Sequence, residues 1–245
     1  MILKKPNRLP NNKENLALSF FDHLDELRVR FIKSILSFLA ATCVFYVFAR
    51  DILHILVKPI GKLVFTSPSD AFMAHVTLSL WGGLFLSFPV IFYQIWQFVS
   101  SGLMPKERHY IFIFGPFSLL LFIAGGLFAY FVMIPISLKF LLAFSSEWIV
   151  PMIEIKNYIS FVGTLILSFG VVFEMPLILM FLTKIGIATP AFLSQKRRHA
   201  IILILIVSAI LTPPDIISQI LMAVPLIVLY EISIVVSKLT YRVKK

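Results

Sequence analysis

Long runs of apolar residues alternate with short polar stretches along almost the whole chain. The six apolar runs cover residues 32–48, 72–99, 110–136, 158–183, 200–211 and 216–237. Several are long enough to cross a hydrocarbon core of roughly 30 Å at about 1.5 Å per residue. Backbone polar groups cannot stay unpaired in lipid, and the runs lack the alternation of barrel strands. The pattern therefore predicts an all-α polytopic membrane protein with six transmembrane helices.

Proline and polar residues modify this pattern. Prolines inside the apolar runs are expected to bend their helices into a curved bundle with a concave side. These prolines are Pro89, Pro116, Pro176 and Pro225. The fifth run, 200–211, corresponds to only about 18 Å of helix, and Gln219 and Glu231 shorten the apolar part of the sixth. The last two helices are thus predicted to be short, in thinned lipid or shielded by protein.

The composition agrees with a membrane protein and excludes an ordinary soluble domain, since 59% of residues are hydrophobic and 14% are charged. We expect one integral membrane domain at 19–238, between a flexible cytoplasmic tail at 1–18 and a basic cytoplasmic tail at 239–245. The first tail has no apolar stretch followed by a small-residue cleavage site, which argues against a cleaved signal peptide. Cys43 is the only cysteine, so no intrachain disulfide can form.

The net charge of +10 follows the predicted topology. Six crossings put both termini on one side of the membrane, and 17 of the 22 Lys and Arg residues fall on that side. The remaining five are Arg50, Lys58, Lys62, Lys139 and Lys156. The positive-inside rule then places both termini in the cytoplasm. Because the charge has this explanation, no nucleic-acid partner is expected.

Motifs for catalysis are missing from the sequence. There is no HExxH, no nucleophile-elbow serine motif and no glycine-rich phosphate loop, and the five histidines have no metal-ligand spacing. We therefore expect neither an enzyme nor a bound metal or cofactor.

The first informative cluster is "SFFDHLDELRVRF" at 19–31. Ser19 with Asp22 fits a capping box, which predicts an amphipathic helix that starts at Ser19 and leads into the first crossing. Three acids occur in five positions on a side of the membrane that otherwise selects bases. Two interpretations stay open: a solvated face with a Glu26 to Arg30 ion pair, or a binding site for a basic segment.

The second cluster is "YQIWQFVSSGLMPKERHY" at 93–110, the first cytoplasmic loop with its flanks. Glu107 lies between Lys106 and Arg108, so an ordinary surface ion pair is one interpretation. It also lies at the same membrane face as Glu26. Together the two acids could form a patch for a basic partner segment.

Glu174 is the residue whose charge has the highest free-energy cost inside the membrane. It stands in "LSFGVVFEMPLIL", 10 residues before Lys184 and about 15 Å from the cytoplasmic interface. A charge there costs at least about 2.5 kcal/mol. Three roles remain open: a neutral acid hydrogen-bonded within the bundle, a docking point for a partner helix, or a proton relay. The last would make the chain a proton-coupled small-solute transporter, although transporters usually place polar groups on several facing helices.

Five motifs together resemble the TatC family of the twin-arginine translocase. They are "HLDELRVR", "FYQIWQFV" with "KER", "SFGVVFEMP", "TPPDIISQ" and "AVPLIVLYEISI", in family order over residues 19–238. The resemblance implies a receptor that binds twin-arginine signal peptides of folded cargo and organises single-span TatA/TatB-type subunits in a multimeric complex. It also implies export driven by the protonmotive force, no cofactor, and a bacterial or archaeal plasma membrane.

The resemblance also carries over individual residues. Those implied to bind the signal peptide are His23, Glu26, Leu27, Arg28, Phe98 and Glu107. Those implied to dock partner helices are Pro59, Glu174, Asp215 and Gln219. Asp215 in "TPPD" has the simpler alternative of capping the last helix. The sequence departs from the family at Ser101, where a proline often precedes "GL".

Overall fold

The protein is described by a computed structural model covering residues 12–58, 60–61, 63–102, 109–146, 148, 150–212 and 216–241. Nearly all of these residues are helical, which confirms the predicted all-α class. The helices are α1 (Asn12–Val57), α2 (Asp70–Ser101), α3 (His109–Phe128), η1 (Ala129–Met133), α4 (Ile134–Leu142), α5 (Ile155–Phe173), α6 (Met175–Lys184), α7 (Pro190–Gln195), α8 (Arg197–Leu211) and α9 (Ile216–Thr240).

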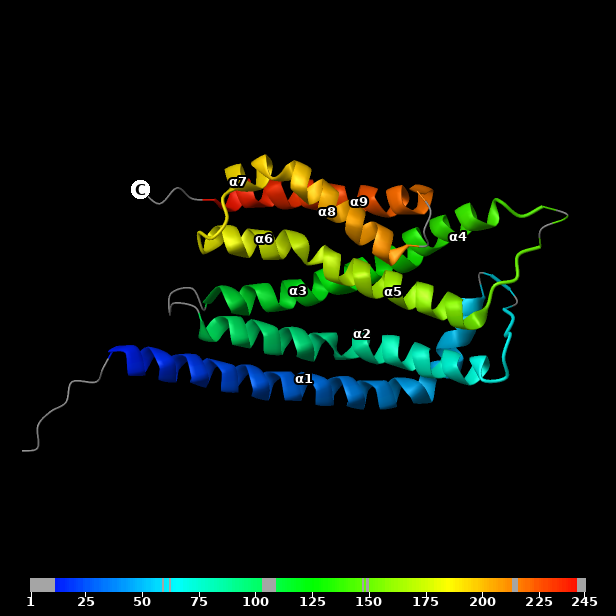
Figure 1. Ribbon diagram of the computed structural model, residues 1–245, viewed down its shortest axis with the longest axis horizontal. Helices are drawn as coiled ribbons and strands as arrows, with labels where there is room; N and C mark the ends of the chain where they lie inside the picture. Colours follow the sequence, from blue (N-terminus) through cyan, green and yellow to red (C-terminus); the bar gives the residue numbers. More distant parts are fainter. Residues whose placement is uncertain are drawn as a thin grey trace, which may run out of the picture.

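The helices form a layered bundle (Figure 1). At one edge α1 packs against α2, and α2 also packs against α3 and α5 in the middle of the bundle. At the opposite edge α9 packs against α6 and α8. The start of α1 and the end of α9 lie at the same end of the bundle, where α2 ends and α3 begins.

Helix α1 is longer than the sequence predicts. It runs without interruption from Asn12 to Val57, so the amphipathic stretch and the first apolar run form one helix. The predicted helix start at Ser19 is wrong, because α1 begins seven residues earlier, at Asn12. The capping pattern of Ser19 and Asp22 therefore lies inside a helix and does not begin one.

Two predicted helices are irregular in the middle. The third run continues from α3 through the π-helical turn η1 into α4. The fourth run, predicted as a single bent helix, is interrupted at Glu174, which ends α5 and precedes α6. Pro176 explains the interruption, because it lacks a backbone donor and is favoured in the first turn of a new helix.

Five stretches of the described chain are long and apolar enough to cross a membrane. They are His23–Val57, Asp70–Ser101, Phe114–Leu142, Ile155–Lys184 and Ile216–Thr240. Helix α8 has 15 residues, slightly more than the apolar run predicts, and is shorter than these five. The prediction that the last helix is also short is wrong, because α9 has 25 residues and Gln219 and Glu231 lie within it.

The loops at the other end of the bundle are joined through their backbones. Val64 and Glu154 form a parallel bridge, in which Ile155 N donates to Val64 O at 2.9 Å. Asp70 then holds the start of α2, because its Oδ2 accepts from Ser67 N at 2.7 Å and from Thr66 N at 3.1 Å. These contacts fix α1, α2 and α5 relative to one another at this end.

Adjacent glycines in α3 give a test of the packing. Gly125 faces the backbone of Phe169 in α5, whereas Gly126 faces the ring end of Phe85 in α2. A methyl group meets an immovable carbonyl at the first position and a rotatable ring at the second. We expect Gly125→Ala to lower the melting temperature in detergent by several degrees, corresponding to about 1–3 kcal/mol of overpacking. Gly126→Ala is the matched control, and an equal or larger loss there would contradict this packing.

Candidate functional site

The predicted acidic site lies where α1 and α2 run side by side at the end of the bundle that contains the start of α1. Glu26 and His23 lie on α1, and Gln94, Phe98 and Ser101 lie on the last two turns of α2. The pairing of the two helices thus brings together residues more than 60 positions apart. We call these residues, with Arg30, the Glu26 site.

An ion pair within α1 occupies the Glu26 carboxylate. Arg30 Nε donates to Glu26 Oε1 at 2.9 Å, and Arg30 Nη2 also contacts that oxygen. The predicted Glu26 to Arg30 pair is therefore confirmed. Arg30 Nη1 in turn donates to Gln94 Oε1 of α2 at 3.4 Å. Arg30 thus links the acid on α1 to an amide on α2.

An aromatic face borders the carboxylate. The His23 ring stacks on Phe98 with 4.4 Å between ring centroids and 18° between ring planes. His23 Nδ1 lies 3.8 Å from Glu26 Oε2 and 3.4 Å from Ser101 Oγ. Ser101 Oγ also donates to Phe98 O at 2.7 Å. The serine in place of the expected proline thus continues α2 and contacts His23.

The site is open to its surroundings. The Glu26 side chain is 27% exposed and that of His23 is 40% exposed. A shallow polar cavity of about 330 Å³ lies over Asp25, Glu26, Arg30 and Lys33. A cationic group can therefore reach the carboxylates without unfolding either helix.

An apolar groove of about 400 Å³ begins at the same place and follows the α1 and α2 interface along the bundle. Arg30 and Gln94 mark its polar end. Its apolar lining includes Leu27, Phe31, Ile35, Phe38, Ile91, Ile95 and Phe98. The polar cavity and the apolar groove thus adjoin at Arg30.

Not every residue that the resemblance assigns to peptide binding joins this cluster. Leu27 lines the groove, whereas Arg28 is exposed and has no contact with the Glu26 carboxylate. Glu107 lies outside the described residues. Gln94 was missed from the sequence, although it stands in the quoted "YQIW" motif; an amide on a membrane helix was the available signal.

Glu174 lies apart from this site, in the interior. It is fully buried, and its Oε2 accepts from Ser118 Oγ of α3 at 2.7 Å. Oε1 has no hydrogen-bond partner among the described residues. The hydrogen bond ties the interruption between α5 and α6 to α3. Of the three roles left open for Glu174, this geometry agrees with that of an acid hydrogen-bonded within the bundle.

Gln219 also makes an internal contact. Its Nε2 donates to Leu205 O of α8 at 3.0 Å, so the start of α9 is tied to the middle of α8. At the other end of this hairpin, Arg197 Nη2 donates to Glu231 Oε2 at 2.8 Å. Asp215 and Pro59, also predicted as docking residues, lie outside the described residues.

Comparisons with known proteins agree with the fold and the motifs. Residues 22–225 match the model of the family described as "Sec-independent protein translocase protein (TatC)". The chain is 39% identical over 230 residues to TatC of Carboxydothermus hydrogenoformans, covering 92% of this chain and 95% of that protein. It is 40% identical over 232 residues to TatC of Aquifex aeolicus, covering 91% and 96%.

The similarity extends to structure. A crystal structure of the twin-arginine translocase receptor TatC superposes with a TM-score of 0.83 at 39% identity, covering 90% of this chain and all of that one. A second, of the same receptor in the detergent DDM, superposes with a TM-score of 0.81 and covers 87% and 98%. On sequence and structure alike, this chain belongs to the TatC family of Sec-independent protein translocases.

Proposed function

We propose that this chain is the core subunit of a twin-arginine translocase and binds twin-arginine signal peptides at the Glu26 site. The observation that carries the proposal is a partly exposed carboxylate, already paired with Arg30, which lies at the polar end of an apolar groove. A signal peptide has a basic segment followed by an apolar one, in the same order as these two surfaces.

The Glu26 to Arg30 pair suggests how binding takes place. A peptide guanidinium replaces Arg30 on Glu26, and Arg30 keeps a polar partner because it already contacts Gln94. Carboxylates accept arginine in a planar, two-bond geometry that lysine cannot reproduce. The second peptide arginine is assigned to Glu107 by family resemblance. The stacked faces of His23 and Phe98 can also receive a guanidinium plane.

The proposed topology has six crossings with both termini in the cytoplasm. The start of α1 and the end of α9 lie at one end of the bundle, which requires an even number of crossings. The short α8 supplies the sixth beside the five longer stretches. The excess of bases at this end supports its placement in the cytoplasm of a bacterial or archaeal cell.

Partner subunits are proposed to pack against the α8 and α9 hairpin within a multimeric complex. Helix α9 has an exposed apolar surface, which begins beside Gln219. The surface consists of Ile216, Ile217, Ile220, Val224 and Val228. Buried Glu174 supports this surface indirectly, because α6 follows it and packs against α9. Export of folded cargo by the assembled complex is driven by the protonmotive force.

Comparing a twin-arginine signal peptide with its two-lysine variant tests the proposed function. The purified chain in detergent is expected to retain the first peptide and to bind the second roughly tenfold or more weakly, because lysine offers no planar pair of donors. Fluorescence anisotropy of labelled peptides measures both affinities. A scrambled peptide of the same composition controls for charge and apolar content. Equal affinity for the arginine and lysine peptides would contradict the proposal.

A further inference from the structure

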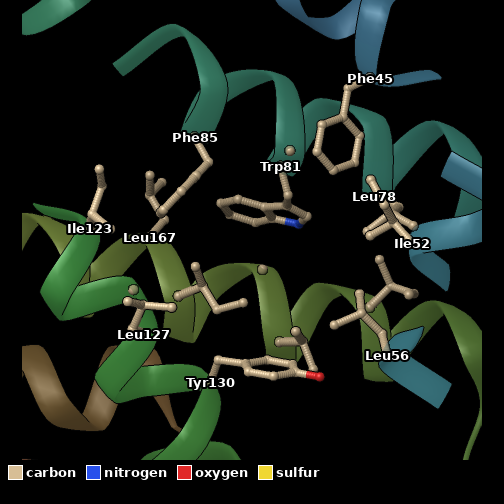
Figure 2. A pocket seen from close by; sticks show the side chains of 16 residues that line it. Phe45, Ile52, Leu56, Leu78, Trp81, Phe85, Ile123, Leu127, Tyr130 and Leu167 are labelled. Atoms are coloured by element: carbon tan, nitrogen blue, oxygen red, sulfur yellow. The ribbon is translucent and has the colours of Figure 1, made fainter. Parts of the chain in front are cut away.

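A second cavity, away from the Glu26 site, lies between the α1 and α2 pair and the α3 and α5 pair (Figure 2). Its volume is about 260 Å³. Trp81 of α2 and Tyr130 of η1 face each other across it. Ile123 and Leu167 lie at one end, and Leu56 of α1 lies at the other.

The cavity follows from specific packing. Gly163 of α5 lies against the Trp81 indole, so any side chain at that position would collide with the ring. The π-helical turn η1 carries Tyr130 and shifts the register of its helix at this point. The large rings thus stand at the walls and leave the space between them open.

The lining is almost wholly apolar. Trp81 and Tyr130 are the two lining residues whose side chains carry a polar atom, and they present their ring surfaces to the cavity. An occupant that matches this lining is therefore hydrocarbon.

The surroundings select the class of occupant. All four helices around the cavity belong to stretches that can cross a membrane. At its rim Ile123 is 39% exposed and Leu127 is 52% exposed, so the cavity opens there to the outer surface of the helices. An apolar cavity of about 150 Å³ already excludes water and accepts small apolar molecules. This one is larger, and the stretches that form its walls are apolar enough to lie among acyl chains.

We propose that this cavity binds one acyl chain of a phospholipid, which enters past Ile123 and Leu127. The bound lipid separates α1 from α3 and sets the spacing of the two helix pairs. This site is independent of signal-peptide binding.

Trp81 makes the site directly measurable. The other two tryptophans are Trp96, buried among Phe114 and Phe181, and Trp148 on the loop after α4. With both changed to Phe, the remaining fluorescence comes from Trp81. Titration with a phosphatidylcholine that carries bromine on its acyl chain, in excess unbrominated detergent, is expected to quench Trp81 along a saturating curve at about one lipid per chain. Quenching of Trp81 that rises in proportion to the lipid fraction, without saturating, overturns the proposal.

Filling the cavity provides the structural control. In the Trp81-only chain, the double variant L127F/L167F narrows the cavity and is expected to weaken lipid binding at least about fivefold. L120F adds the same ring to an exposed position of α3 that does not line the cavity. It is expected to leave binding unchanged. Equal quenching in all three chains overturns the proposal.

The kind of occupant is tested with a purified single-span partner subunit. The subunit is expected to leave the quenching of Trp81 by the brominated lipid unchanged. If the subunit protects Trp81 completely, and no lipid binds in its absence, the occupant is a helix and the proposal fails.

Discussion

Glu26→Lys is expected to weaken binding of a twin-arginine signal peptide by about 30-fold or more. Loss of one member of a partly desolvated charge pair costs about 2 kcal/mol or more, and the new lysine also repels the incoming arginines. In the free protein the lysine faces Arg30, which loses its closest acceptor and keeps Gln94. Glu107→Lys is expected to act in the same direction.

Glu231→Lys is the matched control for this change. Glu231 is also an acid paired with an arginine, since Arg197 donates to it at 2.8 Å, and the change in net charge is the same. It lies on α9, away from the groove, so peptide affinity should stay within about twofold. Peptide anisotropy measures affinity, and size-exclusion elution in detergent checks the fold. Unaltered peptide affinity in the Glu26→Lys chain, or an equal loss of affinity in both variants, would show that Glu26 does not recognise the peptide arginines.

Glu174→Ala is expected to weaken association with a single-span partner subunit roughly tenfold while peptide affinity stays within about twofold. The substitution leaves the buried Ser118 hydroxyl without its partner, which costs about 1–3 kcal/mol. The lost bond anchors α6 to α3, and α6 supports the α9 surface proposed for docking. The Glu26 site lies on α1 and α2, so it should be insensitive.

Glu174→Gln separates this role from a proton relay. A glutamine oxygen can still accept from Ser118, so most of the partner association should remain. A proton relay requires a side chain that exchanges a proton. If Glu174 carried protons, Glu174→Ala and Glu174→Gln would therefore abolish export equally. Ser118→Ala, which breaks the same bond from α3, should resemble Glu174→Ala. Co-purification with a tagged partner provides the measurement, and a larger loss of peptide binding than of partner binding would refute the assignment.

The element class was readable from the sequence because it depends on local composition. Uninterrupted apolar runs in lipid require internally hydrogen-bonded helices, whatever their neighbours are. Helix ends were less predictable. The pattern at Ser19 is typical of a helix start, yet α1 already begins at Asn12. Pro176 indicated a disturbance, but the sequence pattern did not distinguish a bend in one helix from the break at Glu174 that separates α5 from α6.

The acids themselves were visible because charge is costly beside or within a membrane, so Glu26 and Glu174 stood out by chemistry alone. Their partners were not. Gln94 lies 64 residues from Arg30 and Ser118 lies 56 residues from Glu174, distances at which spacing carries no information. The same limit applies to the Trp81 cavity, whose walls come from four separate membrane-crossing stretches.

The sequence alone therefore determined the helical class, the membrane location, the family resemblance and the identity of the key acids. These depend on composition, period and motif order, which are properties of the chain itself. Only the tertiary structure decided that Glu26 opens onto an apolar groove, that Glu174 is sealed against Ser118, and that Trp81 and Tyr130 enclose a cavity. These features depend on which helix faces pack together, and packing joins residues that the linear order keeps apart.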